Sequence, residues 1–451
     1  MVVKKNDFYF CIICMLFFFS EIVGGVYLLL LTGAVTLLWG SKKDNIWVIM
    51  FLLLLFQKAL QRLTTGMAYQ AITYLDEIAE ILLLVMLIHV SIYKFSLDRQ
   101  NKRIFITFLI WIIITIFSSI VNKSASVITI ILDCFVCIKF MIFYQGGRVL
   151  SKRGKFTSID LYKKLNPVCK IITIMLLILS IHDLIFNPFF EKFDYRYFTE
   201  SLQLCFQHPT YLAAVCMTCM VVLMCNMKYD QKNMKYIIML AVIIGLTFRS
   251  KAIGSLLVVF AVYFSSVKYE MKTKGIILIM GICAALYFGM GQIETYFSVG
   301  TSVPIRLKML RDGISIAQRY FPLGAGFGSF GTTVAYESGS SFYYNLGYMT
   351  GYYKDQPVGD AFWPGVFAES GWIGTVFFGG IILFMVLDSI KRLNENKYSG
   401  WTMLSILSYA IIASTAETAF FNPATAFMFI VYGIASDRRD NGTMMQNRRI
   451  R

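Results

Sequence analysis

The residues best suited to chemistry lie in a polar, glycine-rich segment from Thr301 to Leu387, set among long apolar runs. The segment carries Arg306, Arg311 and Arg319, several carboxylates and repeated glycines. Guanidinium groups bind the oxygens of a diphosphate in bidentate pairs, and a carboxylate can accept the proton of a hydroxyl group. So many polar groups kept together outside the apolar runs indicate a site rather than a connector.

The first cations of this segment are predicted to lie on a helix from Pro304 to Arg319 along the membrane surface. Apolar residues recur there at helical spacing, at Leu307, Leu310, Ile314 and Ala317. An interfacial amphipathic helix explains this pattern without any ligand. Arg306 stands apart as the first cation, two residues after the proline, and with Arg311 it is a candidate for binding a diphosphate.

A second cationic candidate is the short turn between two apolar runs that holds Arg249 and Lys251. An unpaired cation at membrane level is expensive, so these residues need a partner or a ligand. The turn offers hydrogen-bond donors for a phosphate. The alternative is an interfacial pair whose aliphatic stems lie along the bilayer.

Three further residues are candidates for proton transfer or ligand contact. Asp360 and Glu369 are nine residues apart and flank the start of the apolar run at 366–387. Glu369, at the apolar margin, could transfer a proton or form a salt bridge with an arginine. His208 could contact a ligand or cap the helix predicted at 209–226.

The sequence GAGFGSFG, with Gly324, Gly326, Gly328 and Gly331, overlaps a dinucleotide-binding fingerprint. No strand is predicted before it, and no helix with an acidic residue follows at the required distance. We therefore expect a tight turn whose N–H groups approach a ligand or another helix.

No cofactor and no metal site are expected from the sequence. Cysteines occur as pairs with i, i+3 spacing, at Cys11 and Cys14, Cys134 and Cys137, and Cys216 and Cys219. Such a pair is half of a metal site, but no histidine or second pair accompanies any of them. We therefore interpret the cysteines as small apolar residues that pack between helices.

The composition places all these residues in a membrane protein. Of 451 residues, 57% are hydrophobic and 16% aromatic, and the mean hydropathy is +0.64. A soluble core of this length could not cover so much apolar side chain. We predict an all-α polytopic membrane protein of about 12 to 14 transmembrane helices with one large extracytoplasmic loop containing short helices.

Fourteen apolar runs support this count. They lie near 8–21, 23–39, 45–60, 76–93, 104–121, 126–144, 167–187, 209–226, 235–248, 252–267, 274–290, 366–387, 401–418 and 424–436. The first two are short and could form one re-entrant hairpin.

The charge distribution orients these runs. The net charge is +16, and with a cytoplasmic N-terminus the inward loops hold 28 lysines and arginines against 12 in outward segments. This bias follows the positive-inside rule, so the charge requires no nucleic-acid partner. We expect both termini in the cytoplasm and the large loop outside.

The chain is predicted to form one integral membrane domain. Residues 1–187 are a helical scaffold, 188–290 hold an outward loop and the runs around the 247–254 turn, 291–365 form the large extracytoplasmic loop, and 366–451 form closing helices and a basic tail.

The order of these motifs resembles the bacterial O-antigen polymerase and ligase superfamily. The matching features are a turn with Thr247, Ser250, Lys251 and Gly254, then an outward arginine helix, then PLGAGFGSF from Pro322 to Phe330, then Glu369, Gly371, Gly374 and Phe378. The resemblance covers residues 236–384. Each motif is weak alone, and their order carries the similarity.

The resemblance implies a metal-independent, GT-C-like glycosyltransferase that uses oligosaccharides on undecaprenyl diphosphate at the outer face of the bacterial cytoplasmic membrane. Arg306, Arg249, Lys251 and Arg311 would bind the diphosphate, Glu369 or Asp360 would be catalytic, and His208, Tyr344 and Tyr352 would contact the substrate. Members often carry His and Asn nine and eight residues before the glutamate. Asp360 and Ala361 stand there instead, which favours a polymerase over a ligase.

The implied products are O-antigen, capsule or exopolysaccharide, and the implied partners are the lipid bilayer, the lipid-linked oligosaccharide, a chain-length regulator and a flippase. Two alternatives remain open at this point. One is a ligase that transfers glycan to another acceptor. The other is a non-enzymatic flippase or transporter, although we find no repeated halves of the kind that transporters show.

Overall fold

The computed structural model describes residues 5–23, 46–92, 99–186, 189–190, 194–196, 199–268, 303–354, 358 and 362–438. Most of these residues are helical. The strands of the described part of the chain are one two-residue antiparallel pair, β1 (Tyr195–Arg196) with β2 (Thr199–Glu200), and turns and loops make up the remainder. The predicted runs at 23–39 and 274–290, and Asp360, lie outside the described residues.

Each predicted apolar run within the described residues coincides with a helix. The helices are α1 (Lys5–Val23), α3 (Ile46–Arg62), α4 (Gly66–Thr73), α5 (Leu75–Ile92), α6 (Arg99–Asn122), α7 (Val127–Lys152), α8 (Ser158–Asp160), α9 (Asn166–Ile185), α10 (Pro209–Cys225), α11 (Asn233–Leu246), α12 (Ser250–Val262), α14 (Ile305–Arg319), α15 (Thr333–Glu337), α16 (Ser341–Asn345), α17 (Phe362–Glu395), α18 (Lys397–Ser414) and α19 (Pro423–Ala435). In the described part of the chain, six helical segments are long and apolar enough to cross a membrane, and two shorter apolar helices accompany them. The prediction of an all-α polytopic membrane protein is confirmed.

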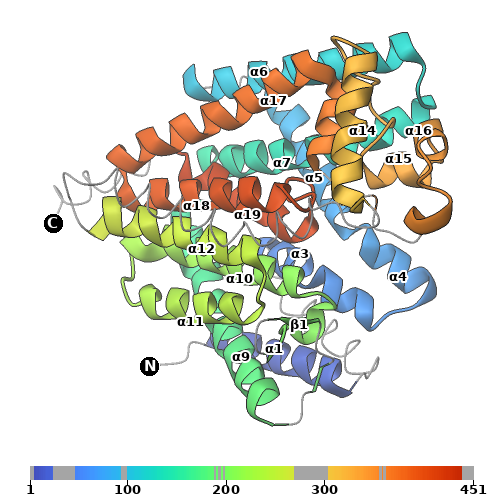
Figure 1. Ribbon diagram of the computed structural model, residues 1–451. Helices are drawn as coiled ribbons and strands as arrows, with labels where there is room; N and C mark the ends of the chain where they lie inside the picture. Colours follow the sequence, from blue (N-terminus) through green and yellow to red (C-terminus); the bar gives the residue numbers. More distant parts are fainter. Residues whose placement is uncertain are drawn as a thin grey trace.

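The long helices form a bundle in which α10 is central (Figure 1). Helix α10 packs on α9, α11, α18 and α19 and is buried along its length apart from Tyr211. A helix that is apolar on all sides is expected in such a position. On the outside of the bundle, large apolar side chains such as Val85, Ile113 and Val376 are more than half exposed. These side chains suit contact with lipid tails.

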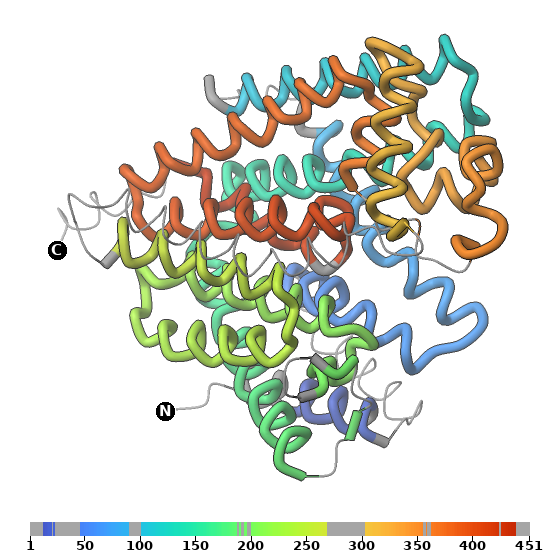
Figure 2. Tube along the Cα trace, in the orientation of Figure 1, coloured from blue at the N-terminus to red at the C-terminus, as the bar shows by residue number. Residues whose placement is uncertain are grey.

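Connections between the long helices gather at two ends of the bundle (Figures 1 and 2). The α6–α7, α11–α12 and α18–α19 connections lie at one end, together with α14, α15 and α16. The α7–α8, α10–α11 and α17–α18 connections lie at the opposite end. We call the end that holds α14 the α14 end.

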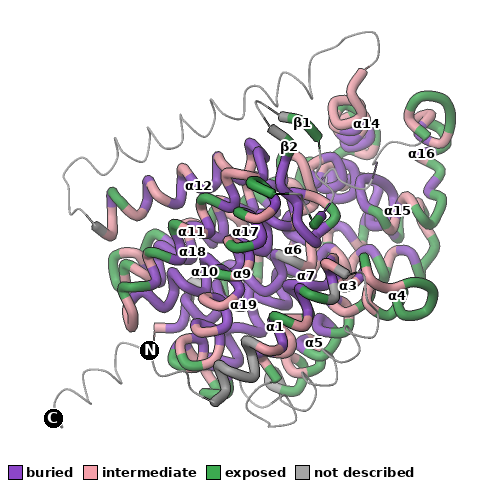
Figure 3. The backbone as a smooth tube through the Cα atoms, turned by 90° about the horizontal axis from the view of Figure 1, so that it is seen from below, coloured by how far each residue is buried: buried purple, intermediate pink, exposed green. Residues whose placement is uncertain are grey.

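Helix α14 crosses the ends of the long helices instead of running along them (Figure 1). Its bounds agree with the predicted helix from Pro304 to Arg319. It packs against α17 through a buried face that includes Met309, Gly313 and Ile316. A Cβ atom at Gly313 would lie 2.7 Å from the carbonyl oxygen of Pro364, so glycine permits this close approach. Figure 3 shows the change from buried to exposed residues around this helix.

Candidate functional site

One cation of α14 is held by an internal network. Lys308 Nζ lies 2.7 Å from Asp312 Oδ2, and above the rings of Tyr348 and Tyr353 at 4.4 and 5.5 Å from their centroids. The Tyr348 hydroxyl donates a hydrogen bond to the same Asp312 oxygen at 2.7 Å. Burial, and then the bond to Asp312, raise the pKa of Tyr348, so its hydroxyl stays protonated. This network fastens α14 to the tyrosine-rich segment that follows it.

The two arginines of α14 that are predicted to bind a diphosphate emerge from different sides of this helix. Arg306 is half-buried and Arg311 is exposed. Five residues along an α-helix correspond to a rotation of about 140°. The helix therefore does not bring these two guanidinium groups together.

The α11–α12 turn lies at the same end of the bundle as α14 (Figure 1). Arg249 is the N-cap residue of α12 and is 7% exposed. Lys251 forms an ion pair with Glu417 at 2.8 Å. Because the start of a helix carries partial positive charge, Arg249 and the first N–H groups of α12 together favour an anion.

Glu417, which lies in the α18–α19 connection and balances the charge of Lys251, was not predicted as a site residue. Its signal in the sequence was a single carboxylate at the end of the apolar run predicted at 401–418. Nothing in the sequence alone showed that this turn and the α11–α12 turn would meet.

His208 caps a helix, as one of its two interpretations expected. Its Nδ1 accepts a hydrogen bond from the N–H of Thr210 at 3.1 Å at the start of α10. Tyr344 and Tyr352 are 62% and 60% exposed, so their ring faces are accessible. Asp360 lies outside the described residues.

The glycine-rich loop approaches other helices. Gly324, Gly326, Gly328 and Gly331 have φ angles of +79°, +94°, +75° and +93°. A Cβ atom at Gly326 would lie 2.4 Å from the Cα of Ser119 on α6. The Phe327 N–H donates to the Ser119 hydroxyl at 2.8 Å, and the Asn122 amide donates to the carbonyl of Gly324 at 2.9 Å. Of the two expected partners for this turn, the structure shows the helix.

The same loop fills a break in α17. Gly371 has non-helical φ and ψ angles of 61° and −165°, which divide the helix into two parts. The N–H groups of Ala325 and Gly326 donate to the carbonyls of Ala368 and Glu369 at 2.8 and 2.9 Å, and the N–H of Ile373 donates to the carbonyl of Pro322 at 3.2 Å. Backbone groups freed by a break within a membrane must find such partners. The glycine-rich loop and the break at Gly371 therefore satisfy each other's backbone hydrogen bonds.

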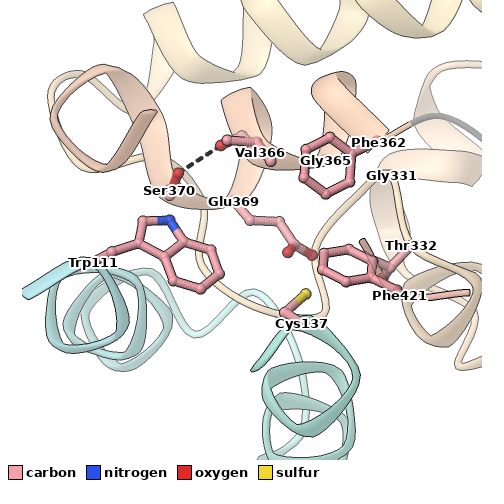
Figure 4. Close-up of a pocket in the computed structure, with 10 residues that line it drawn as sticks. All are labelled: Trp111, Cys137, Gly331, Thr332, Phe362, Gly365, Val366, Glu369, Ser370 and Phe421. Atoms are coloured by element: carbon pink, nitrogen blue, oxygen red, sulfur yellow. Dashed lines mark hydrogen bonds between the residues drawn. The ribbon is translucent and has the colours of Figure 1, made fainter. Parts of the chain in front are cut away.

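Glu369 is buried beneath this loop. It is 3% exposed, and its Oε1 accepts a hydrogen bond from the N–H of Gly328 at 3.1 Å. The same N–H donates to Oδ2 of Asp133 on α7 at 2.7 Å. Glu369 also lines a cavity of about 10 Å³, which Figure 4 shows. A cavity of this size holds one water molecule and excludes a sugar ring.

Neither Asp133 nor Cys137, which lies one turn further along α7 and lines the same cavity, was singled out from the sequence as a partner of Glu369. Asp133 lies inside the apolar run predicted at 126–144, and a carboxylate within a transmembrane helix is itself a signal of a buried polar site.

No protein-family model matches the chain, and no curated protein matches its sequence.

Proposed function

We propose that this chain is a glycosyltransferase that polymerises oligosaccharide repeat units carried on undecaprenyl diphosphate. The observation that carries the proposal is that two cation-bearing segments, α14 and the α11–α12 turn, lie at the same end of a membrane-spanning bundle (Figure 1). A lipid-linked sugar has the same layout, with an apolar tail for the helix surfaces and a diphosphate for the cations at the water boundary.

The proposed chemistry is displacement of a lipid diphosphate from the sugar carbon to which it is joined. Negative charge develops on the departing phosphate oxygen, and guanidinium groups placed there stabilise the transition state more than the ground state. We assign this role to Arg306 and Arg249. Lys251, already paired with Glu417, is assigned to holding the turn in place.

An acceptor hydroxyl on a second lipid-linked unit must lose its proton as it attacks. The sequence predicts Asp360 or Glu369 as the acceptor of that proton. The small size of the cavity beside Glu369 favours Asp360, since a sugar ring does not fit into a space of about 10 Å³. The exposed rings of Tyr344 and Tyr352 are suited to stacking on sugar faces.

The test is a purified protein in lipid nanodiscs supplied with an undecaprenyl-diphosphate oligosaccharide. A polymerase yields a ladder of products that differ by one repeat unit and releases undecaprenyl diphosphate. The same protein in sealed vesicles, moving intact substrate across the bilayer with no ladder, would instead be a flippase. A product formed only when a different acceptor lipid is added would identify a ligase.

The proposal places the protein in the bacterial cytoplasmic membrane with the α14 end facing outward. Expected partners are then a flippase that delivers the repeat units and a chain-length regulator. The product is O-antigen, capsule or exopolysaccharide.

A further inference from the structure

Two helices bring three potential metal ligands together inside the bundle. Asp133 and Cys137 are four residues apart on α7 and so share one face of that helix. Glu369 faces them from α17. Their ligand atoms all lie within 4.8 Å of one another, and all three residues are buried. Figure 4 shows the Glu369 carboxylate and the Cys137 sulfur pointing toward each other across the cavity.

No described side chain forms a salt bridge with the carboxyl groups of this cluster. Asp133 is fully buried, and its Oδ1 has no hydrogen-bond partner among the described residues. Lys139, the lysine nearest to Asp133 along the same helix, is already paired with Asp76 of α5. Two buried carboxyl groups that share one N–H donor must be neutralised, either by a proton held between them or by a positive partner.

We propose that Asp133, Cys137 and Glu369 bind one divalent transition-metal ion of the zinc type. A divalent ion balances the two carboxylates, and zinc accepts both thiolate and carboxylate ligands in a tetrahedral arrangement. Magnesium and calcium are excluded because they require six or more ligands that are almost all oxygens. The cavity beside Cys137 and Glu369 has room for one water molecule at the fourth position.

Binding proceeds with loss of the thiol proton of Cys137 to solvent, since thiolate is the form that coordinates a metal. The ion has a structural role. It joins α7 to the part of α17 that precedes its break, and it holds the carboxylates to which the Gly328 N–H is bonded. This site is independent of the proposed glycosyl transfer at the α14 end.

The test measures metal content, with no substrate present. Wild-type protein is incubated with zinc or cobalt, freed of unbound ion and examined by elemental analysis. We expect one ion per chain, a sulfur-to-cobalt charge-transfer band in the cobalt form, and a higher melting temperature than in the chelated protein. Cys137→Ser removes the band, and Asp133→Asn and Glu369→Gln bind the ion more than about tenfold more weakly.

Cys134→Ser is the matched control, because Cys134 lies on α7 one turn before Cys137 and outside the cluster. It keeps both the ion and the band. A folded wild-type protein that retains no ion overturns the proposal and leaves a shared proton between the carboxyl groups. Equal loss of the band in Cys134→Ser also overturns it. If the cluster variants do not fold, the wild-type stoichiometry and cobalt spectrum decide. Failure here leaves the polymerisation assay unaffected.

Discussion

Two lysines at the α14 end form ion pairs with carboxylates of the same chain. Lys308 has Asp312 at 2.7 Å and Lys251 has Glu417 at 2.8 Å. Lys251 was predicted as a diphosphate ligand. Its partner Glu417 comes from a distant turn, so the sequence did not indicate the ion pair. Side chains from segments more than 150 residues apart meet only in the folded chain, so single-sequence reasoning finds the cations and misses what balances them.

The Lys251–Glu417 pair is predicted to couple the two turns in stability. Each side chain is less than one-fifth exposed, so breaking the pair leaves a poorly solvated charge. We expect Lys251→Met and Glu417→Gln each to lower the free energy of unfolding by about 1 to 3 kcal/mol. The double variant should lose less than the sum, as measured by denaturant unfolding in detergent. Additive losses would show that the two residues do not interact.

Substitutions at His208 distinguish a helix-capping role from a ligand-binding role. We expect His208→Ala to destabilise the protein by about 0.5 to 2 kcal/mol, because the N–H of Thr210 loses its acceptor. Asparagine is a strong N-cap residue, so His208→Asn should regain this stability and retain the product ladder. A stable His208→Asn protein that forms no ladder would instead identify His208 as a substrate contact.

At the scale of elements, helix α14 could be predicted and the break in α17 could not. Pro304 and the apolar spacing fix the start and the face of α14 in the sequence itself. Gly371 lies within an apolar run that predicts an unbroken helix. Nothing in the sequence therefore indicated its positive φ angle. Its partner, the loop at Gly324, lies 47 residues earlier, and a Cβ atom at Gly371 would lie 2.2 Å from the nitrogen of Gly324.

The glycine-rich loop is predicted to tolerate no side chain where it touches α6. Gly326→Ala adds a Cβ atom 2.4 Å from the Cα of Ser119 to a residue with φ of +94°, and should lower stability by about 3 kcal/mol or more. Gly347 is the control, since its φ is +76° and nothing lies within 4 Å of an added Cβ. Gly347→Ala should lower stability by about 1 to 2 kcal/mol. Equal shifts in melting temperature would show that the contact with α6 is unimportant.

At the scale of the whole molecule, apolar runs and basic loops predicted a polytopic helical bundle because bilayer thickness fixes helix length. Which helices neighbour which was not predictable, since each run is apolar on most faces. The orientation remains a prediction that follows from the distribution of lysine and arginine.

Cysteine labelling tests that orientation. Glu337 lies on α15 at the α14 end and Lys155 lies in the α7–α8 connection at the other end, and both are exposed. We expect Glu337→Cys to react with a membrane-impermeant maleimide on intact cells whose outer envelope has been opened. Lys155→Cys should react only after the cytoplasmic membrane is permeabilised. Both are compared with the wild-type background, and the reverse pattern would place α14 in the cytosol.

The most direct test of the account compares two arginines of α14 in the nanodisc polymerisation assay. Arg306→Ala should slow product formation by about 100-fold or more, because the departing diphosphate loses a cation, while the protein remains folded. Arg306→Lys should retain a small part of the activity, since an ammonium group cannot bind both oxygens. Arg319→Ala, in the exposed last turn of the same helix, should form a normal ladder. A normal ladder from Arg306→Ala would contradict the account.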